Sequence, residues 1–299
     1  MVENLSHLHP TTRKLISGSD DDRFADLDRS KWIGYPAANA ALQKLEYLLA
    51  LPKTHRMPNL IVCGHTNSGK TMIIKRFLKA HPATDQVEED AANVPVLAVQ
   101  MPISPEPRRF YCALLSSLFA SFRSTDTIAN LEAQALNLMR SCGVRLLVID
   151  ELHNMLSGRN DHQRQFLNLL RYLGNELSIP IVALGIQSAL RGIQIDEQLA
   201  NRFEPFVLQR WTANRDLYRL LNSIESLLPL RYPSRLSEPK TAELILALSE
   251  GTIGEIMLLL RASARFAISS GIEKIDQETF HSCGYVSPAA RRIASKSLG

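Results

Sequence analysis

The chain has 299 residues, of which 45% are hydrophobic and 21% charged, and its formal net charge is +4. This is the composition of a globular protein with one large domain or, more in keeping with the length, two packed ones. We find no apolar run long enough to cross a bilayer and no signal-peptide stretch near the start, so we expect a cytoplasmic protein without membrane contact. A net charge this small does not establish nucleic-acid binding.

Four cysteines are spread along the chain, and none is paired in a C-x₂-C pattern. This spacing argues against a zinc site or a disulfide framework. We expect these residues to be small buried hydrophobes, namely Cys63, Cys112, Cys142 and Cys283.

Residues 1 to 30 show no sustained hydrophobic period and are predicted to form an N-terminal arm with one short helix at Pro10 to Ile16. Such arms are often ordered only when a partner binds. After Trp32-Ile-Gly-Tyr-Pro36, apolar residues recur at helical spacing and predict a helix over Ala37 to Ala50.

The most specific signal begins with a short apolar run, Leu60 to Cys63, which predicts a strand. It is followed by Gly64-His-Thr-Asn-Ser-Gly69-Lys70-Thr71 and a helical pattern over Met72 to Lys79, which together give the phosphate-binding loop G-x-x-x-x-G-K-[ST] in its strand-to-helix context. The glycines let backbone N–H groups point at phosphate oxygens, the lysine reaches the β- and γ-phosphates, and the threonine hydroxyl binds Mg²⁺. The predicted ATP contacts are Gly64, His65, Thr66, Asn67, Ser68, Gly69, Lys70, Thr71 and Met72.

An apolar segment just ahead of the first strand often holds the adenine in P-loop ATPases, and Ile33 to Pro36 is suitably placed. Tyr35 and Pro36 are therefore candidate nucleotide contacts. The alternative is that Trp32 and Tyr35 only close the core.

A polar span, His81 to Asn93, leads to an apolar run at Val94 to Met101, which is typical of a parallel strand buried on both faces. The proline-rich loop after it ends in Arg108 and Arg109, where a helix is expected to begin. Cations are unfavourable there unless an anion is near, so these two arginines are candidate contacts for DNA phosphates. An ordinary solvated loop is the alternative.

Helices are expected over Phe110 to Phe122 and Ile128 to Cys142, and a strand follows them in Arg145-Leu-Leu-Val-Ile-Asp150-Glu151. Its end would place Asp150 beside the nucleotide to hold the Mg²⁺ shell, while Glu151 would polarise the attacking water. The four apolar residues before these acids fit a buried strand better than a helix start.

Strands and helices then alternate, which predicts a doubly wound parallel sheet of five strands. From Thr212 onward the strand signals vanish and only helices are expected. The expected elements are a helix at Gln163 to Leu177, a strand at Ile179 to Gly185, a helix from Asp196 to Arg202, a strand at Pro205 to Leu208, and helices at Asn214 to Leu228, Glu238 to Ser249, Ile253 to Ser270 and Asp276 to Cys283. The domains predicted are an arm (1–30), an α/β nucleotide-binding domain (31–211), a helical lid (212–283) and a basic tail (284–299).

This order of motifs is similar to that of an AAA+ ATPase, with a three-layer α/β sandwich and a small helical lid. More narrowly, the chain resembles the transposon-encoded TniB proteins, relatives of the transposition regulator TnsC. The resemblance rests on Trp32 to Pro36, Arg56-Met-Pro-Asn59, Ile149-Asp-Glu-Leu-His-Asn154 and Asp196 to Pro205.

The resemblance implies an ATP-dependent protein that oligomerises as a ring or filament on double-stranded target DNA, recruits a DDE-type transposase and is guided by a TniQ-like target-selection subunit. It also implies that Arg202 reaches the γ-phosphate of a neighbouring subunit, whereas the alternative is an arginine that caps its own helix.

Two departures from the family pattern affect the expected rate of ATP hydrolysis. At the end of the fourth strand, where a polar residue is expected, the chain has Ile186, and Gln187 beside it is the candidate nucleotide contact. Glu255 stands where many members of the wider superfamily have an arginine. A slow ATPase is therefore expected.

Two other functions share this core. One is a replication initiator or helicase loader, which is disfavoured because no helix-turn-helix domain is evident after Gly284. The other is a nucleotide-dependent scaffold that never hydrolyses ATP, against which Asp150 and Glu151 argue. The arm and the tail are the candidate segments for contact with the transposase.

Overall fold

The computed structural model describes residues 5–85, 92–157 and 159–296, and contacts divide the chain into two units. One unit comprises Ala37–Thr66 and Lys70–Leu208. The other comprises the chain up to Pro36, the three residues Asn67–Gly69 and the chain from Gln209 onward. Parts of the predicted arm, of the polar span 81–93 and of the tail therefore lie outside the described residues, at 1–4, 86–91 and 297–299.

The first unit is built on a five-stranded sheet in the order β2-β3-β4-β1-β5, and every neighbouring pair is parallel. Each strand corresponds to one of the predicted apolar runs, which confirms the fold class. The strands are β1 (Asn59–Gly64), β2 (Val96–Gln100), β3 (Leu146–Asp150), β4 (Ile181–Gly185) and β5 (Phe203–Leu208).

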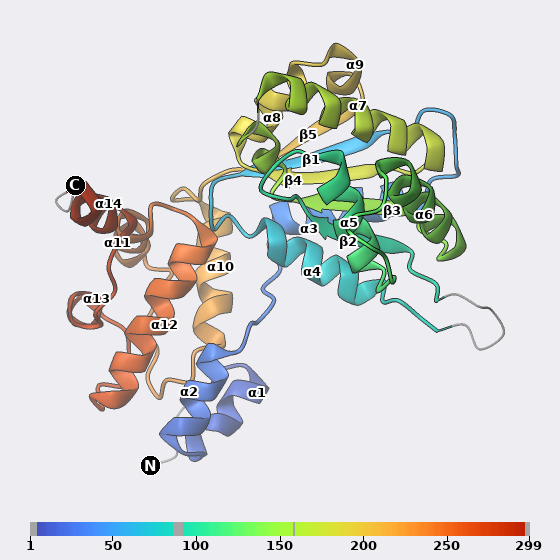
Figure 1. Cartoon of the computed structure of the whole chain (residues 1–299). Helices are drawn as coiled ribbons and strands as arrows, with labels where there is room; N and C mark the ends of the chain where they lie inside the picture. The colour runs from blue at the N-terminus through green and yellow to red at the C-terminus, as the bar shows by residue number, and fades with distance from the viewer. Residues whose placement is uncertain (1–4, 86–91, 158, 297–299) are drawn as a thin grey trace. The chain divides into compact units, whose positions relative to one another are not determined.

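Helices cover both faces of this sheet, which makes three layers (Figure 1). Alternate strand residues such as Ile61 and Ile149 share a buried cluster with residues of α5, α6, α7 and α8, while α4 contacts β1 and β4 and lies with α3 on the other face (Figure 1). Because both faces are covered, the central strands are apolar between their first and last residues. The helices are α3 (Pro36–Ala50), α4 (Lys70–Ala80), α5 (Pro107–Ser117), α6 (Ile128–Ser141), α7 (Asn160–Leu177), α8 (Gln187–Gln194) and α9 (Glu197–Ala200), with the 3₁₀ helix η2 (Leu152–Ser157) after β3.

The amino end of β1 is tied to both neighbouring strands by Asn59, whose side chain is buried. Its backbone N–H donates to the carbonyl of Arg202 at 2.8 Å, and its side-chain Oδ1 accepts from the backbone N–H of Ile181 at 2.8 Å. These bonds satisfy polar groups at a strand start that would otherwise be buried without a partner. They also fix the starts of β5 and β4 beside the start of β1.

The second unit is helical in the part that the structure describes, as predicted beyond Thr212. Its core is formed by the apolar faces of α10, α11 and α12, together with Leu27 from the N-terminal arm. The helices are α10 (Arg215–Ser226), α11 (Pro239–Ser249), α12 (Ile253–Ser269), α13 (Gln277–Ser282) and α14 (Pro288–Lys296) at the C-terminal side, and α1 (Pro10–Arg13), the 3₁₀ helix η1 (Lys14–Ser17) and α2 (Asp20–Asp28) from the arm.

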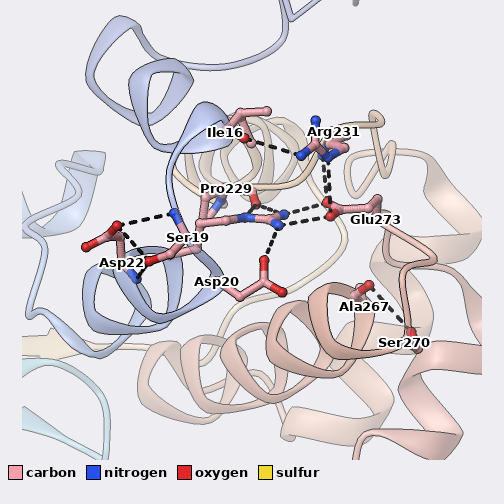
Figure 2. A network of polar contacts seen from close by, with 10 residues as sticks. Ile16, Ser19, Asp20, Asp22, Pro229, Arg231, Ala267, Ser270 and Glu273 are labelled. Atoms are coloured by element: carbon pink, nitrogen blue, oxygen red, sulfur yellow. Dashed lines mark hydrogen bonds and ion pairs between the residues drawn. The ribbon is translucent and has the colours of Figure 1, made fainter.

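The arm contains more structure than the single short helix predicted from its sequence. Helix α2 begins with a capping box between Ser19 and Asp22. Its Arg23 is almost fully buried and donates to both carboxylate oxygens of Glu273 and to the carbonyl of Pro229. Glu273 also pairs with Arg231, and Figure 2 shows Arg231 beside the Glu273 carboxylate. A buried charge pair supported by further hydrogen bonds holds the arm to the C-terminal helices.

Within the predicted basic tail, Pro288–Lys296 form helix α14, none of whose residues is buried. Two of its arginines pair with acids of the same unit, Arg291 with Glu255 and Arg292 with Glu250. Helices α8 and α14 were not among the helices predicted from sequence. No described helix is long and apolar enough to span a membrane.

The Arg23 contacts lead to a local prediction. Replacing Arg23 with alanine leaves Glu273 buried with one partner fewer, so α2 should detach from the unit at a cost of about 3–5 kcal/mol. Amide hydrogen exchange should quicken across residues 20–28 and stay unchanged in α7. Arg29→Ala, which removes an exposed charge one residue beyond α2, is the control. Exchange in α2 as slow in Arg23→Ala as in the parent chain would contradict this role.

Candidate nucleotide-binding site

The predicted phosphate loop joins the carboxyl end of β1 to the first turn of α4. Gly69 has a φ of +90° and Asn67 a φ of 62°, so the backbone turns through the left-handed region at two places. A glycine takes up the first of these without the steric cost of a Cβ, and asparagine is among the residues that best tolerate the second. The loop therefore has the bends with which backbone N–H groups surround an anion.

Lys70, the first residue of α4, has a nearly buried ammonium group. Its Nζ donates to the loop carbonyls of Gly64 and His65, each at 2.9 Å. Burial lowers the pKa of this ammonium, while the carboxylates of Glu151 and Asp150 act in the opposite direction. A desolvated cation at the base of the loop is suited to bind phosphate oxygens, whose negative charge would offset the cost of its burial.

The hydroxyl of Thr71 donates to Oδ2 of Asp150 at 3.0 Å. This bond joins the phosphate loop to the end of β3, so the two motifs identified in the sequence form one site. A hydroxyl and a carboxylate are oxygen ligands of the kind that Mg²⁺ prefers, and a Mg²⁺ bound with nucleotide takes only one or two protein ligands besides phosphate and water. No group of three or more His, Cys, Asp or Glu side chains among the described residues could hold a metal by itself. The chemistry of the Thr71 hydroxyl and the Asp150 carboxylate fits a Mg²⁺ that binds together with a nucleotide.

Glu151 follows at a strained position, with a φ of 56°. Its backbone N–H donates to Oδ1 of Asp150 at 2.8 Å, and its side-chain Oε2 lies 3.2 Å from Nε2 of His153. The Nδ1 atom of His153 is buried without a hydrogen-bond partner in the described structure. The Glu151 carboxylate is thus held beside Asp150 by His153, a residue to which sequence analysis assigned no role.

The other predicted contacts of the first unit lie at two different edges of the sheet. Gln187 is exposed at the start of α8, directly after Ile186 at the carboxyl end of β4. Arg202 precedes β5 and donates to Oδ1 of Asn175 at 2.7 Å. Parallel strands share their amino edge, so Arg202 lies at the edge opposite to the phosphate loop. This hydrogen bond joins Arg202 to α7, and not to a carbonyl of its own helix α9 as the alternative predicted.

Tyr35 and Pro36, which were predicted to bind the adenine, belong to the helical unit. The Tyr35 ring packs edge-on against Trp211, with ring centroids 5.2 Å apart, and burial raises the pKa of its hydroxyl to about 12. This packing is what the alternative interpretation of Tyr35 predicts. A role in adenine binding stays a proposal.

Arg108 and Arg109, the candidate DNA contacts, lie in the first turn of α5. The Arg108 guanidinium donates to the backbone carbonyls of Ser124 and Asp126 and so holds the following loop. Arg109 is exposed and pairs with Glu106 at 3.2 Å. Of the two, Arg109 is freer to contact a phosphate.

Glu255, which stands where an arginine was expected, is buried in the helical unit. It accepts hydrogen bonds from Nδ2 of Asn67 at 2.9 Å and from the hydroxyl of Tyr285 at 2.8 Å, and it pairs with Arg291. Three donors compensate the burial of its charge. The carboxylate seen in the sequence is therefore part of a hydrogen-bonded group that joins Asn67 of the phosphate loop, which belongs to this unit, to the C-terminal segment.

A family model for the bacterial TniB protein matches residues 23–213, which is most of the chain. The chain belongs to the TniB family. No curated protein sequence matches it significantly. Family membership agrees with the motifs at Arg56 to Asn59 and Ile149 to Asn154.

Solved structures share the fold of this TniB-family chain at low sequence identity. The ORC2 protein of Aeropyrum pernix, in ADPNP and ADP complexes, has a TM-score of 0.59 and 15% identity, over 86% of this chain and 70% of that chain. The ORC1 protein of Aeropyrum pernix, in complex with DNA, has a TM-score of 0.58 and 17% identity, over 87% and 68%. Cdc6p of Pyrobaculum aerophilum has a TM-score of 0.57 and 16% identity, over 85% and 68%. The chain therefore has the AAA+ ATPase fold.

The position of Lys70 leads to a binding prediction. Lys70→Ala removes the cation at the base of the phosphate loop, so ATP binding should fall below detection in isothermal titration calorimetry. Lys75→Ala, on the exposed side of the same helix, removes an equal charge and should bind ATP like the parent chain. Equal ATP affinity in both variants would remove Lys70 from the site.

Proposed function

We propose that this protein is an ATP-dependent DNA-binding regulator of DNA transposition. In this function ATP binding drives self-association on double-stranded target DNA, the assembly recruits a DDE-type transposase under the guidance of a TniQ-like target-selection subunit, and slow hydrolysis of ATP disassembles it. Membership in the TniB family supports the transposition context. The observation that carries the ATPase part is the 3.0 Å bond from the Thr71 hydroxyl to Asp150.

The site supplies the groups for phosphoryl transfer to water. In the proposed reaction the oxygen of a water attacks the γ-phosphorus, and the bond from that phosphorus to the β,γ-bridging oxygen breaks with its electron pair leaving on ADP. Glu151 orients the water and accepts its proton, which then passes to solvent. Lys70 and the loop N–H groups stabilise the charge on the β- and γ-phosphates. Bound Mg²⁺, held by Thr71 and Asp150, would neutralise part of that charge.

In the proposal Arg202 completes the site of a neighbouring subunit. The supporting observation is its place at the amino edge of the sheet, away from the phosphate loop of its own chain. A guanidinium entering from outside can bind the γ-phosphate with two parallel hydrogen bonds. Self-association would then be coupled to ATP, because the bound phosphate would bridge two copies.

Steady-state phosphate release, measured with and without duplex DNA, tests this function against a scaffold that never hydrolyses ATP. The parent chain should release phosphate slowly, and Lys70→Ala should release none. Absence of phosphate release from the parent chain under both conditions would favour the scaffold. A replication-initiator function has no support beyond the shared fold, because the similar ORC and Cdc6 structures are under 25% identical.

The proposed role of Glu151 leads to a prediction about the lifetime of assemblies on DNA. Glu151→Gln keeps the shape of the side chain but removes the proton acceptor, so ATP should bind with unchanged affinity while turnover falls by roughly a hundredfold or more. Assemblies on DNA, followed by light scattering after dilution, should persist correspondingly longer. Normal turnover in Glu151→Gln would contradict the assignment, and Glu197→Gln, at the start of α9, serves as a neutral control.

The exposed position of Arg109 gives a prediction on DNA binding. Arg109→Ala should weaken binding to all duplex sequences alike and reduce the slope of log affinity against log salt by about 1, because one phosphate contact is lost. Arg109→Lys keeps the charge and should keep the slope. A slope unchanged in Arg109→Ala would exclude this residue from the DNA surface.

A further inference from the structure

An open pocket of about 450 Å³ lies in the α/β unit at the starts of two strands. It is lined by Arg56, Met57, Pro58, Gln198, Asn201 and Arg202. Two of these side chains are cations and none is an acid, so the pocket favours an anion. We call it the arginine pocket.

The sheet register explains why the two arginines meet. Asn59 pairs with Phe203 in neighbouring parallel strands, and the Asn59 N–H donates to the carbonyl of Arg202 at 2.8 Å. Arg56 precedes β1 by a few residues and Arg202 directly precedes β5. Both therefore lie at the amino edge of the sheet.

The phosphate loop of the same chain begins at the other end of β1, after Gly64. A strand rises about 3.3 Å per residue, so the length of β1 separates the two ends by roughly 16 Å. This is farther than an arginine side chain extends. The arginine pocket cannot contact a nucleotide bound in its own chain.

The local structure presents Arg56 to solvent. Met57 is buried, and the backbone N–H and the hydroxyl of Thr54 contact its sulfur at 3.3 and 3.2 Å. This anchor fixes the residue next to Arg56, while Arg56 itself is exposed. Within the described residues Arg56 makes no hydrogen bond or ion pair, whereas Arg202 is oriented by Asn175. The Arg202 guanidinium is thus held in place, whereas the N–H groups of the Arg56 guanidinium are all available to a ligand.

We propose that the arginine pocket binds the triphosphate held in the phosphate loop of a second copy of this chain, with Arg56 acting as a second cation beside Arg202. The inference rests on the proposed function and adds to it a residue for the contact between subunits. Two planar guanidinium groups can together satisfy several phosphate oxygens. The size of the pocket lies within the range of sites for small ligands, so a polyphosphate fits.

The first test measures self-association rather than activity. Sedimentation of the full chain with Mg²⁺ and a non-hydrolysable ATP analogue should show assembly weakened roughly ten- to a hundredfold in Arg56→Ala, as expected for the loss of hydrogen bonds to a charged group. Calorimetry at concentrations where the chain is monomeric should give one bound analogue per chain with affinity within about twofold of the parent. Lys53→Ala removes an exposed charge of the same loop outside the pocket and should assemble normally.

The second test asks whether Arg56 acts on another subunit. Lys70→Ala cannot bind nucleotide but keeps both arginines, and Arg56→Ala has the complementary defect. A mixture of the two should hydrolyse ATP faster than the sum of the separate variants, because Arg56 of one copy then faces the nucleotide of the other. A mixture no faster than the sum would overturn the proposal.

Other outcomes point elsewhere and would also overturn it. A second analogue bound per chain and lost in Arg56→Ala would assign the pocket to free nucleotide. Normal assembly with weakened DNA binding in Arg56→Ala would assign it to DNA phosphates. Assembly of Lys70→Ala with the analogue as strong as that of the parent chain would instead show that the proposed function itself is wrong.

Discussion

The hydrogen bond from the Thr71 hydroxyl to the Asp150 carboxylate connects two segments that are far apart in the chain. It can form because β1 and β3 are parallel strands of one sheet, so that the loops after them open on the same edge. The neighbouring groups depend on the same arrangement: Lys70 lies one residue before the threonine, and Glu151 is held by its own N–H bond to Asp150. A slip in strand register would separate Lys70 from Asp150 and Glu151.

Much of this arrangement could be predicted because its signals are local. The apolar runs before Gly64 and before Asp150 indicate buried parallel strands, and the segment from Gly64 to Thr71 has the residue spacing of a phosphate-binding loop. The helical unit was also predicted, because strand signals vanish after Thr212 and helix start and stop signals follow. Each of these features can be recognised within about a dozen consecutive residues.

The features that were missed depend on distant partners. Helix α2 looks like a solvated acidic segment in the sequence, because its buried Arg23 is compensated by Glu273 at the other end of the chain. Helix α14 buries no residue and is held by ion pairs to Glu250 and Glu255. Helix α8 contains Gly192, a poor helix former that is placed where a Cβ would lie 2.4 Å from the end of Met155. No local pattern could reveal these pairings.

The opposite placement of the phosphate loop and the arginine pocket has a consequence for any assembly that joins them. Such a contact uses two different surfaces, so it is head-to-tail and either closes into a ring or continues as a helix with unlike ends. In a ring the arginine pocket of a neighbouring subunit would contact every bound nucleotide. In an open array one terminal subunit would hold a nucleotide that no arginine of a neighbour reaches. Turnover per subunit would then increase with array length, since the idle terminus becomes a smaller fraction of the whole.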